Sequence, residues 1–269
     1  MSTKLNGVAE TLFITVKARA EESLRTNGLL HDPYAVALLE KLNEEGIRGI
    51  EEVSRPSQIG TVIRTVLLDE LTAHFSARHH EALVVNLGCG LDARRSRLQL
   101  KNIHWYDIDL PEVIKLRKRF FQEEHRYTLI PCSMLNEKWL TEIPSHLPTL
   151  ILAEGVTMYF EGAQLKALAD AVLRHFKQVE AAFDVVSPWV AKHTRNHPDV
   201  SKYDASFKWG LKSAKALEKK IPQLEILSER SFMLQQALSR WPLYMRPFRH
   251  FNFVKNMCRI IHCRKRSFS

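Results

Sequence analysis

The sequence lacks the features that mark secreted, membrane-spanning and metal-binding proteins. No stretch of its 269 residues holds 18 uncharged apolar residues, so no membrane span is expected. The start has no apolar signal-peptide segment, and a cytoplasmic protein is therefore expected. The four cysteines are Cys89, Cys132, Cys258 and Cys263, and no two of them form a CxxC pair. Reduced thiols and no metal site are expected from this spacing.

Acidic residues are missing from the last part of the chain. The net charge is +9, from 39 Lys and Arg against 30 Asp and Glu, and no acid follows Glu229. Residues 240–266 carry eight Lys or Arg, interleaved with aromatic residues such as Trp241, Tyr244 and Phe248. Such a basic end can bind nucleic acid or anionic lipid, surround an acidic substrate, or form a solvated face. No RNA-binding signature accompanies it, so nucleic acid is not an expected partner.

Repeats, low-complexity tracts and long linkers are also absent, which favours one structural domain in two parts. Residues 1–80 have apolar residues at helical spacing around Leu12 and Val16, after Asp32-Pro33, and over Ile59–Phe75. This part is predicted to be an all-helical N-terminal cap.

Over residues 81–269, short apolar runs alternate with helical patterns. Strands are expected at 83–87, 103–107, 127–131, 149–153, 181–186, 224–227 and 258–263. A helix is expected to begin with Asp109 as its N-cap and Pro111 in its first turn. Residues 187–221 interrupt the alternation and are predicted to be a helical insertion after the fifth strand. The expected fold is therefore α/β, with a doubly wound, mostly parallel, seven-stranded Rossmann-like sheet.

A glycine-rich loop follows the first expected strand. Gly88–Ala93 (GCGLDA) satisfies the dinucleotide pattern GxGxxA, in which glycines permit a sharp turn and close approach of a ligand. Asp107 and Asp109, 19 and 21 residues after Gly88, stand where an acid binds the ribose hydroxyls of such a ligand. The spacing alone fits a nicotinamide enzyme as well as a methyltransferase.

The charge of the loop favours one of these two cofactors. A dinucleotide places its pyrophosphate at the loop, where the carboxylate of Asp92 would repel it. S-adenosylmethionine has no phosphate and carries a cationic sulfonium and an ammonium group, which an acid attracts. S-adenosylmethionine is therefore the expected cofactor, and the alternatives are a merely structural glycine turn and a nicotinamide oxidoreductase.

Several segments together resemble a known family. Asn86–Arg94 (NLGCGLDAR), Tyr106–Val113 (YDIDLPEV) and Ala153–Tyr159 (AEGVTMY) resemble the leucine carboxyl methyltransferase family, and most closely its bacterial tetracenomycin-type polyketide O-methyltransferase branch. Lys17–Ser23 (KARAEES) and Ile63–Asp69 (IRTVLLD) extend the resemblance into the cap. The family implies a Rossmann-like methyltransferase fold and S-adenosylmethionine-dependent methyl transfer to an oxygen.

The resemblance also implies roles for particular residues. The methionine end of the cofactor would lie against Arg19 (or Lys17), Arg64 and Glu154, with the carboxylate of Glu154 facing the ammonium group. The adenosine end would lie against Gly88, Gly90, Asp107, Asp109, Ser133 and Met134. No catalytic residue is assigned, and Glu154 and Arg64 are given positioning roles.

The methyl acceptor is the least determined part of the prediction. The family includes protein C-terminal carboxylates and small polyketide-like acids as acceptors, and the bacterial branch favours a small molecule. A carboxylate oxygen is the expected methyl acceptor, and a phenol or another hydroxyl group is the alternative. An ionised carboxylate needs no general base, whereas a phenol does, and His193 and His197 in the insertion are the candidates. A base-methylating enzyme is disfavoured because Ala153–Val156 (AEGV) replaces the Asn/Asp-Pro-Pro-aromatic turn of that class.

Overall fold

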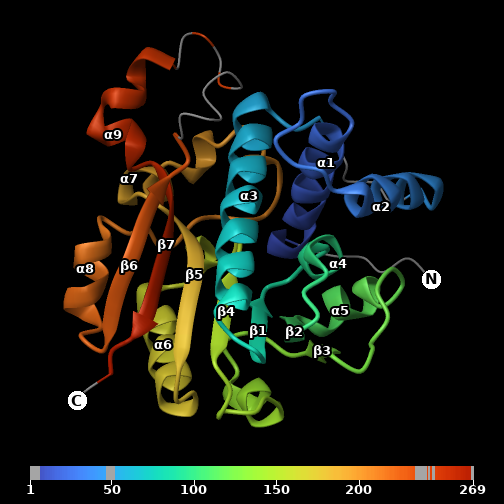
Figure 1. The fold of residues 1–269 in the computed structure, drawn as a ribbon. Helices are drawn as coiled ribbons and strands as arrows, with labels where there is room; N and C mark the ends of the chain where they lie inside the picture. The colour runs from blue at the N-terminus through green and yellow to red at the C-terminus, as the bar shows by residue number, and fades with distance from the viewer. Residues whose placement is uncertain (1–6, 47–51, 234–240, 242, 244–245, 268–269) are drawn as a thin grey trace.

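A seven-stranded sheet lies between two layers of helices in the computed structural model, which describes residues 7–46, 52–233, 241, 243 and 246–267 (Figure 1). The strands are β1 (Ala82–Leu87), β2 (Ile103–Asp109), β3 (Tyr127–Pro131), β4 (Thr149–Ala153), β5 (Val179–Val186), β6 (Leu224–Ser231) and β7 (Cys258–Lys265). Their order is β3-β2-β1-β4-β5-β7-β6, and only β7 runs antiparallel to its neighbours. The expected doubly wound α/β fold is confirmed.

Three helices precede the first strand, and the others lie in the segments between strands. They are α1 (Leu12–Ser23), α2 (Pro33–Glu44), α3 (Arg55–Ala77), α4 (Arg94–Leu98), α5 (Pro111–Arg117), α6 (Gly162–His175), α7 (Pro188–Lys192), α8 (Ala214–Lys220) and α9 (Asn252–Lys255). Asp32 caps α2 by accepting the N–H of Ala35, and Ser54 caps α3 by accepting that of Ser57. Proline follows each cap in the first turn, where its missing N–H costs nothing.

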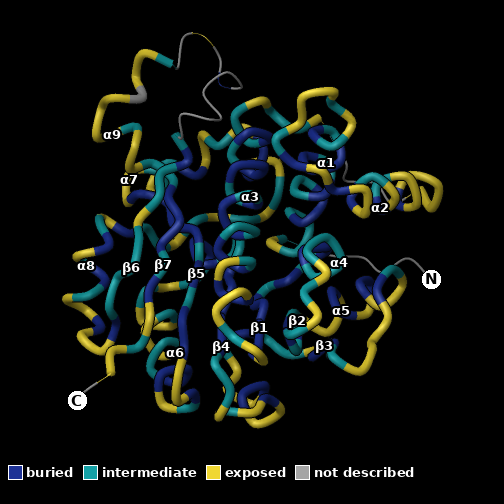
Figure 2. The backbone as a smooth tube through the Cα atoms, viewed as in Figure 1, coloured by how far each residue is buried: buried dark blue, intermediate teal, exposed yellow. Residues whose placement is uncertain are grey.

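The two faces of the sheet carry separate apolar cores. All six residues of β1 and all five of β4 are buried, as expected for strands covered on both faces (Figure 2). Val84 packs on the face that α3 crosses, whereas Leu83 and Val85 pack toward α6. Asp109 of β2 and Asp184 of β5 lie near the carboxyl ends of their strands. They are therefore at the same edge of the sheet as the glycine loop that follows β1.

The helical cap shares an apolar core with the sheet. Leu12 and Val16 of α1 and Leu67 of α3 belong to the same apolar cluster as Val84 and Trp105 of the sheet. Because neither part has this core without the other, we propose that residues 1–80 and 81–269 fold as one unit.

Two local expectations need correction. Asp109 is the last residue of β2, paired with Pro131 of β3, and Leu110 occupies the N-cap position of α5 instead. The strand extends this far because its ladder with β3 continues. The insertion contains little helix, since only α7 and α8 fall within residues 187–221 and the rest is short 3-10 turns and loop.

Several basic residues near the end of the chain form ion pairs or hydrogen bonds with other groups of the protein. Arg259 is buried on β7 and binds Glu229 at 2.6 Å, and Arg264 binds Glu225 at 2.8 Å. Lys265 donates to the carbonyls of Leu173 and Phe176 at the end of α6, where a cation is favourable. Two residues of this segment named above, at positions 240 and 244, lie outside the described residues. No helix in the described part of the chain is long and apolar enough to cross a membrane.

Candidate functional site

The glycine loop joins β1 to α4 in a conformation that only glycine adopts without strain. Gly88 has φ of +65° and Gly90 has φ of +49°. A Cβ on Gly88 would lie 2.8 Å from Cγ2 of Val156, in the loop after β4. The backbone N–H groups of Gly88 and Cys89 donate to the carbonyl of Ile108, which fastens the loop to β2.

A cavity of about 430 Å³ opens beside this loop at the carboxyl ends of β1, β2 and β4. Eight of the nine predicted cofactor residues line it, namely Arg19, Arg64, Gly88, Gly90, Asp109, Ser133, Met134 and Glu154. Asp107 is the exception. The cavity is of the size and position expected for a ligand site in an open α/β sheet.

Asp107 is a buried structural residue rather than a wall of the cavity. Its side chain accepts hydrogen bonds from Arg117 at 2.6 Å, Tyr127 at 2.6 Å, Trp105 at 2.9 Å and Asn86 at 3.0 Å. Arg117 also donates to the carbonyls of two loop residues at positions 90 and 92. Asp107 therefore supports the loop from below, and its carboxylate has no oxygen left for a ligand.

Asp109 lines the cavity and holds its carboxylate against two backbone N–H groups. Oδ2 accepts the N–H of Gly90 at 2.7 Å, and Oδ1 accepts the N–H of Leu110 at 2.8 Å. Burial raises the pKa of Asp109 to about 6, against the lowering effect of these two backbone N–H groups. A carboxylate that lines a cavity and lacks a cationic partner in contact is suited to accepting hydroxyl groups.

Two arginines of α4 were not assigned a role from the sequence, and they form ion pairs with the acids near the cavity. Arg94 donates to Asp92 at 2.7 Å, to Glu154 at 2.5 Å and to Asp69 at 2.7 Å. Arg97 binds Asp69 at 2.7 Å and approaches Asp92 at 3.6 Å. All of these groups lie in a shared, largely buried ion network under the cavity.

Asp92 is paired with arginines of the protein and is not a free anion in the glycine loop. Burial alone would raise its pKa, but Arg94, Arg97 and Arg19 hold that pKa well below its ordinary value. Its negative charge is balanced within the protein and is not directed at a bound cation. The predicted contact of Glu154 with the ammonium group of the cofactor is open to the same objection. Arg94 and Arg64 lower the pKa of Glu154 despite its burial, and they occupy its carboxylate oxygens.

The two predicted cap arginines differ in their surroundings. Arg19 is buried and donates to the carbonyl of Leu91 at 2.9 Å, beside Asp32 at 3.2 Å. Arg64 donates from Nε to Glu154 at 3.0 Å and from Nη1 to Asp184 at 3.1 Å. Both line the cavity, whereas Lys17, the alternative to Arg19, does not.

A second cavity, of about 300 Å³, adjoins the first. The two share five wall residues, which are Thr11, Thr15, Arg64, Gly155 and Tyr159. Gly155 has φ of +69°, and a Cβ there would lie 2.9 Å from the Arg64 guanidinium. The remaining walls are mostly apolar and come from α3, the insertion and the segment before β7. His197 is among them, whereas His193 stacks on Trp189 and lines neither cavity.

Gly155, Tyr159 and Asp184 were not predicted as site residues. The signal for Asp184 was present, since it is an acid near the carboxyl end of a buried strand, as Asp109 and Glu154 are. Its Oδ1 accepts the N–H of Gly155 at 2.6 Å, and its Oδ2 holds Arg64. Asp184 thus fixes the position of Arg64 at the wall between the cavities.

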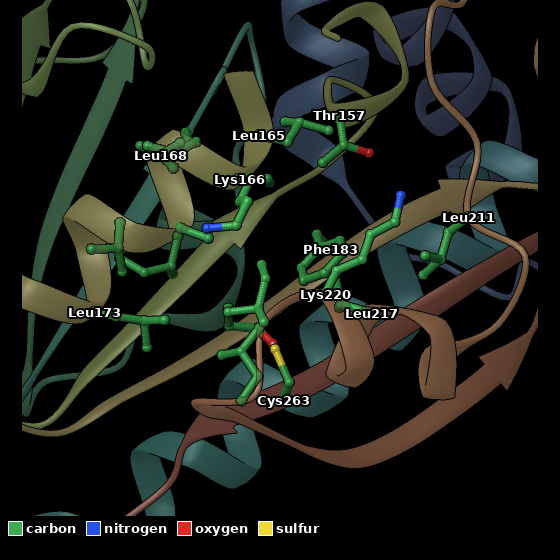
Figure 3. Close-up of a pocket in the computed structure, with 18 of the residues that line it drawn as sticks. Thr157, Leu165, Lys166, Leu168, Leu173, Phe183, Leu211, Leu217, Lys220 and Cys263 are labelled. Atoms are coloured by element: carbon green, nitrogen blue, oxygen red, sulfur yellow. The ribbon is translucent and has the colours of Figure 1, made fainter. Parts of the chain in front are cut away.

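A third cavity, of about 450 Å³, lies on the opposite face of the sheet between α6 and α8 (Figure 3). Its walls are almost wholly apolar and include Leu165, Leu173, Phe183 and Leu217. It shares only Met134 with the cavity at the glycine loop and no residue with the second cavity. It is therefore separate from the site.

Comparison with known proteins agrees with this geometry. Residues 13–173, more than half of the chain, match the leucine carboxyl methyltransferase family. The chain is 33% identical over 231 residues to the tetracenomycin polyketide synthesis O-methyltransferase of Streptomyces glaucescens, covering 86% of this chain and 85% of that protein. It is 29% identical over 251 residues to an S-adenosyl-L-methionine-dependent methyltransferase of Gibberella zeae, with 86% and 84% covered.

A solved structure shows the same fold. The magnesium protoporphyrin IX methyltransferase of Synechocystis with bound S-adenosylhomocysteine superposes with a TM-score of 0.52 at 11% identity, covering 87% of this chain and 100% of that one. The resemblance noted from the sequence motifs is thus confirmed over most of the chain. The chain belongs to the leucine carboxyl methyltransferase family and is an S-adenosylmethionine-dependent O-methyltransferase.

Proposed function

We propose that this enzyme methylates the carboxylate of a small organic acid that binds in the second cavity. The observation that carries the proposal is the wall shared by the two cavities at Arg64, Gly155 and Tyr159. A cofactor in the first cavity and an acceptor in the second would face each other there, as in-line transfer requires. The apolar walls of the second cavity suit an aromatic or polyketide-like body.

The residues of the first cavity fit S-adenosylmethionine. Asp109 would accept the ribose hydroxyls, because no cation contacts its carboxylate among the described residues, and Ser133 and Met134 would lie beside the adenine. We assign the methionine end to Arg19 and Arg64, whose guanidinium groups attract its carboxylate. Bound there, the cofactor supplies an electrophilic methyl group on a sulfonium leaving group.

A carboxylate acceptor is favoured because no free base faces the second cavity among the described residues, since His197 at its wall uses Nδ1 to accept two backbone N–H groups. The carboxylate of Asp184 is taken by Arg64 and by the N–H of Gly155. Burial raises the pKa of Tyr159, although a hydrogen bond from Thr11 opposes this, so its hydroxyl stays protonated. An acid is ionised at neutral pH and attacks without proton transfer, whereas a phenol would have to lose its proton first.

Catalysis would then consist of alignment, charge placement and exclusion of water. Glu154 and Asp184 hold the Nε and Nη1 of Arg64, so its guanidinium is fixed in place at the shared wall. Apolar side chains of the insertion and of the segments next to β6 and β7 would surround the acceptor in the second cavity. As the carboxylate oxygen takes the methyl group from sulfur, the positive charge of the sulfonium and the negative charge of the carboxylate would both disappear, so a dry, fixed environment favours the transfer.

We also propose a cytoplasmic location and a small-molecule partner. All four cysteines are free, which suits a reducing compartment. A cavity of about 300 Å³ suits a small acceptor better than a protein chain or a nucleic acid strand.

Matched pairs of acceptors test the proposal. Wild-type enzyme and labelled S-adenosylmethionine are incubated with 2-naphthoate, 2-naphthol and 2-naphthalenemethanol, and then with larger polycyclic acids and phenols of the same shapes. The acids are expected to give methyl esters, which dilute alkali cleaves to methanol. Labelled products that resist alkali, formed from the phenols only, would contradict a carboxylate acceptor and favour a phenol O-methyltransferase.

A further inference from the structure

His197 stands at the wall of the second cavity, in the insertion between β5 and β6. It follows the 3-10 turn Thr194–Asn196 and precedes the turn Val200–Lys202. Its Nδ1 accepts the backbone N–H of Asp199 at 3.3 Å and that of Val200 at 3.1 Å. A backbone N–H can only donate, so Nδ1 must act as the acceptor and a neutral ring carries its hydrogen on Nε2.

The ring is neutral under ordinary conditions. Burial lowers the pKa of His197, and the nearby carboxylate of Asp199 offsets this only in part. Protonation of Nδ1 would also break both contacts with the backbone. Nε2 has no hydrogen-bond partner in the described part of the chain. It is therefore an unused N–H donor on a ring that lines the cavity.

The surroundings hold this donor in one position. Asp199, two residues on, accepts hydrogen bonds from the N–H and hydroxyl of Ser54 at the start of α3. The ring of His197 meets the edge of Phe207 at 5.9 Å between centroids, and Phe207 meets Tyr159 at 5.3 Å. Tyr159 belongs to the wall shared by both cavities. The donor is thus linked through packed rings to the place of transfer.

We propose that the Nε2–H of His197 binds one oxygen of the acceptor carboxylate, so that the other oxygen faces the methyl group. This assignment rests on the proposed function, because it takes the acceptor to be an acid in the second cavity. It excludes the role of general base considered for His197 from the sequence. A base needs an unprotonated nitrogen that can reach the substrate. Nδ1 is occupied by backbone N–H groups, and the free nitrogen, Nε2, carries the hydrogen.

The tautomer can be measured without any acceptor. In enzyme labelled with ¹⁵N in its histidine rings, the signals lost in His197→Asn identify this residue among the 12 histidines. The ¹⁵N shifts and the couplings to the ring hydrogens are expected to show hydrogen on Nε2 and none on Nδ1. Hydrogen on Nδ1 at pH 7 would overturn the proposal, whichever acceptor the enzyme uses.

Two substitutions separate the donor from the turn that carries it. Asparagine at this position can still accept the backbone N–H groups as an Asx turn, but its shorter side chain removes the donor. His197→Asn is expected to raise KM for the acid substrate, 2-naphthoate or the larger acid that the wild type prefers, about tenfold or more. We expect kcat to change less than threefold. His197→Gln, which can place an amide N–H near the lost Nε2–H, should recover part of the KM.

The controls distinguish failure of this proposal from failure of the proposed function. Affinity for S-adenosylhomocysteine should be the same in wild type and His197→Asn, because His197 does not line the first cavity. An unchanged KM for the acid in His197→Asn would overturn the role of His197 alone. A wild type that methylates phenols but no acid would overturn the proposed function, and the carboxylate-binding role with it.

Discussion

Replacing Asp107 with alanine is expected to lower the free energy of unfolding by about 3–5 kcal/mol, because it leaves a buried guanidinium without its carboxylate. Arg117 is 1% exposed and lies 2.6 Å from Asp107, and it also holds two carbonyls of the glycine loop. Chemical denaturation followed by circular dichroism measures the change.

The matched control is the other acid of the same strand. Asp109→Ala should change the free energy of unfolding of the ligand-free enzyme by about 1 kcal/mol or less, because only two backbone N–H groups bind its side chain. Burial raises its folded pKa, so the ionised side chain adds no stability at neutral pH. If Asp107→Ala were as stable as Asp109→Ala, Asp107 would not support the loop.

Asp109→Ala is expected to show the opposite pattern in ligand binding, with affinity for S-adenosylhomocysteine falling about 100-fold. Loss of two hydrogen bonds from ribose hydroxyls to a carboxylate corresponds to about 2.8 kcal/mol. Isothermal titration calorimetry at pH 7.5 gives the dissociation constants. Normal binding by Asp109→Ala would show that the ribose lies elsewhere.

The pH dependence of binding provides an internal check on Asp109. Its pKa in the free enzyme is raised to about 6, and only the ionised carboxylate accepts from both hydroxyls. Affinity for S-adenosylhomocysteine should therefore be constant above pH 7 and weaken as the pH falls through 6. Asp109→Asn should bind weakly with no such change between pH 5 and 7.5. An identical pH profile in this variant would assign the titration to another group, such as a histidine.

Much of the fold could be predicted because its signals are local. β1 and β4 are short apolar runs followed by glycine and by an acid, and α2 and α3 begin at N-cap residues that can be recognised within a few positions. Asp109 illustrates the limit of such signals. Its position before Leu110-Pro111 is typical of an N-cap, yet the ladder with β3 extends the strand and turns the carboxylate toward Gly90.

The electrostatics of the site could not be predicted in the same way, because each ion pair depends on distant segments. Arg94 meets Glu154 60 residues away, and Arg64 meets Asp184 120 residues away. The cofactor inferred from Asp92 is confirmed by the family comparison, but the carboxylate that suggested it is neutralised by arginines of α4. His197 is similar, since its direction in the cavity depends on backbone N–H groups that no motif records.

Methyl transfer as proposed requires the cofactor and the acceptor to meet at the wall that the two cavities share. A crystal structure of the enzyme with S-adenosylhomocysteine tests this most directly. We expect the ribose hydroxyls on Asp109 and the sulfur at the wall formed by Arg64, Gly155 and Tyr159, facing the second cavity. A sulfur directed away from that wall, or adenosine bound in the second cavity, would contradict the account.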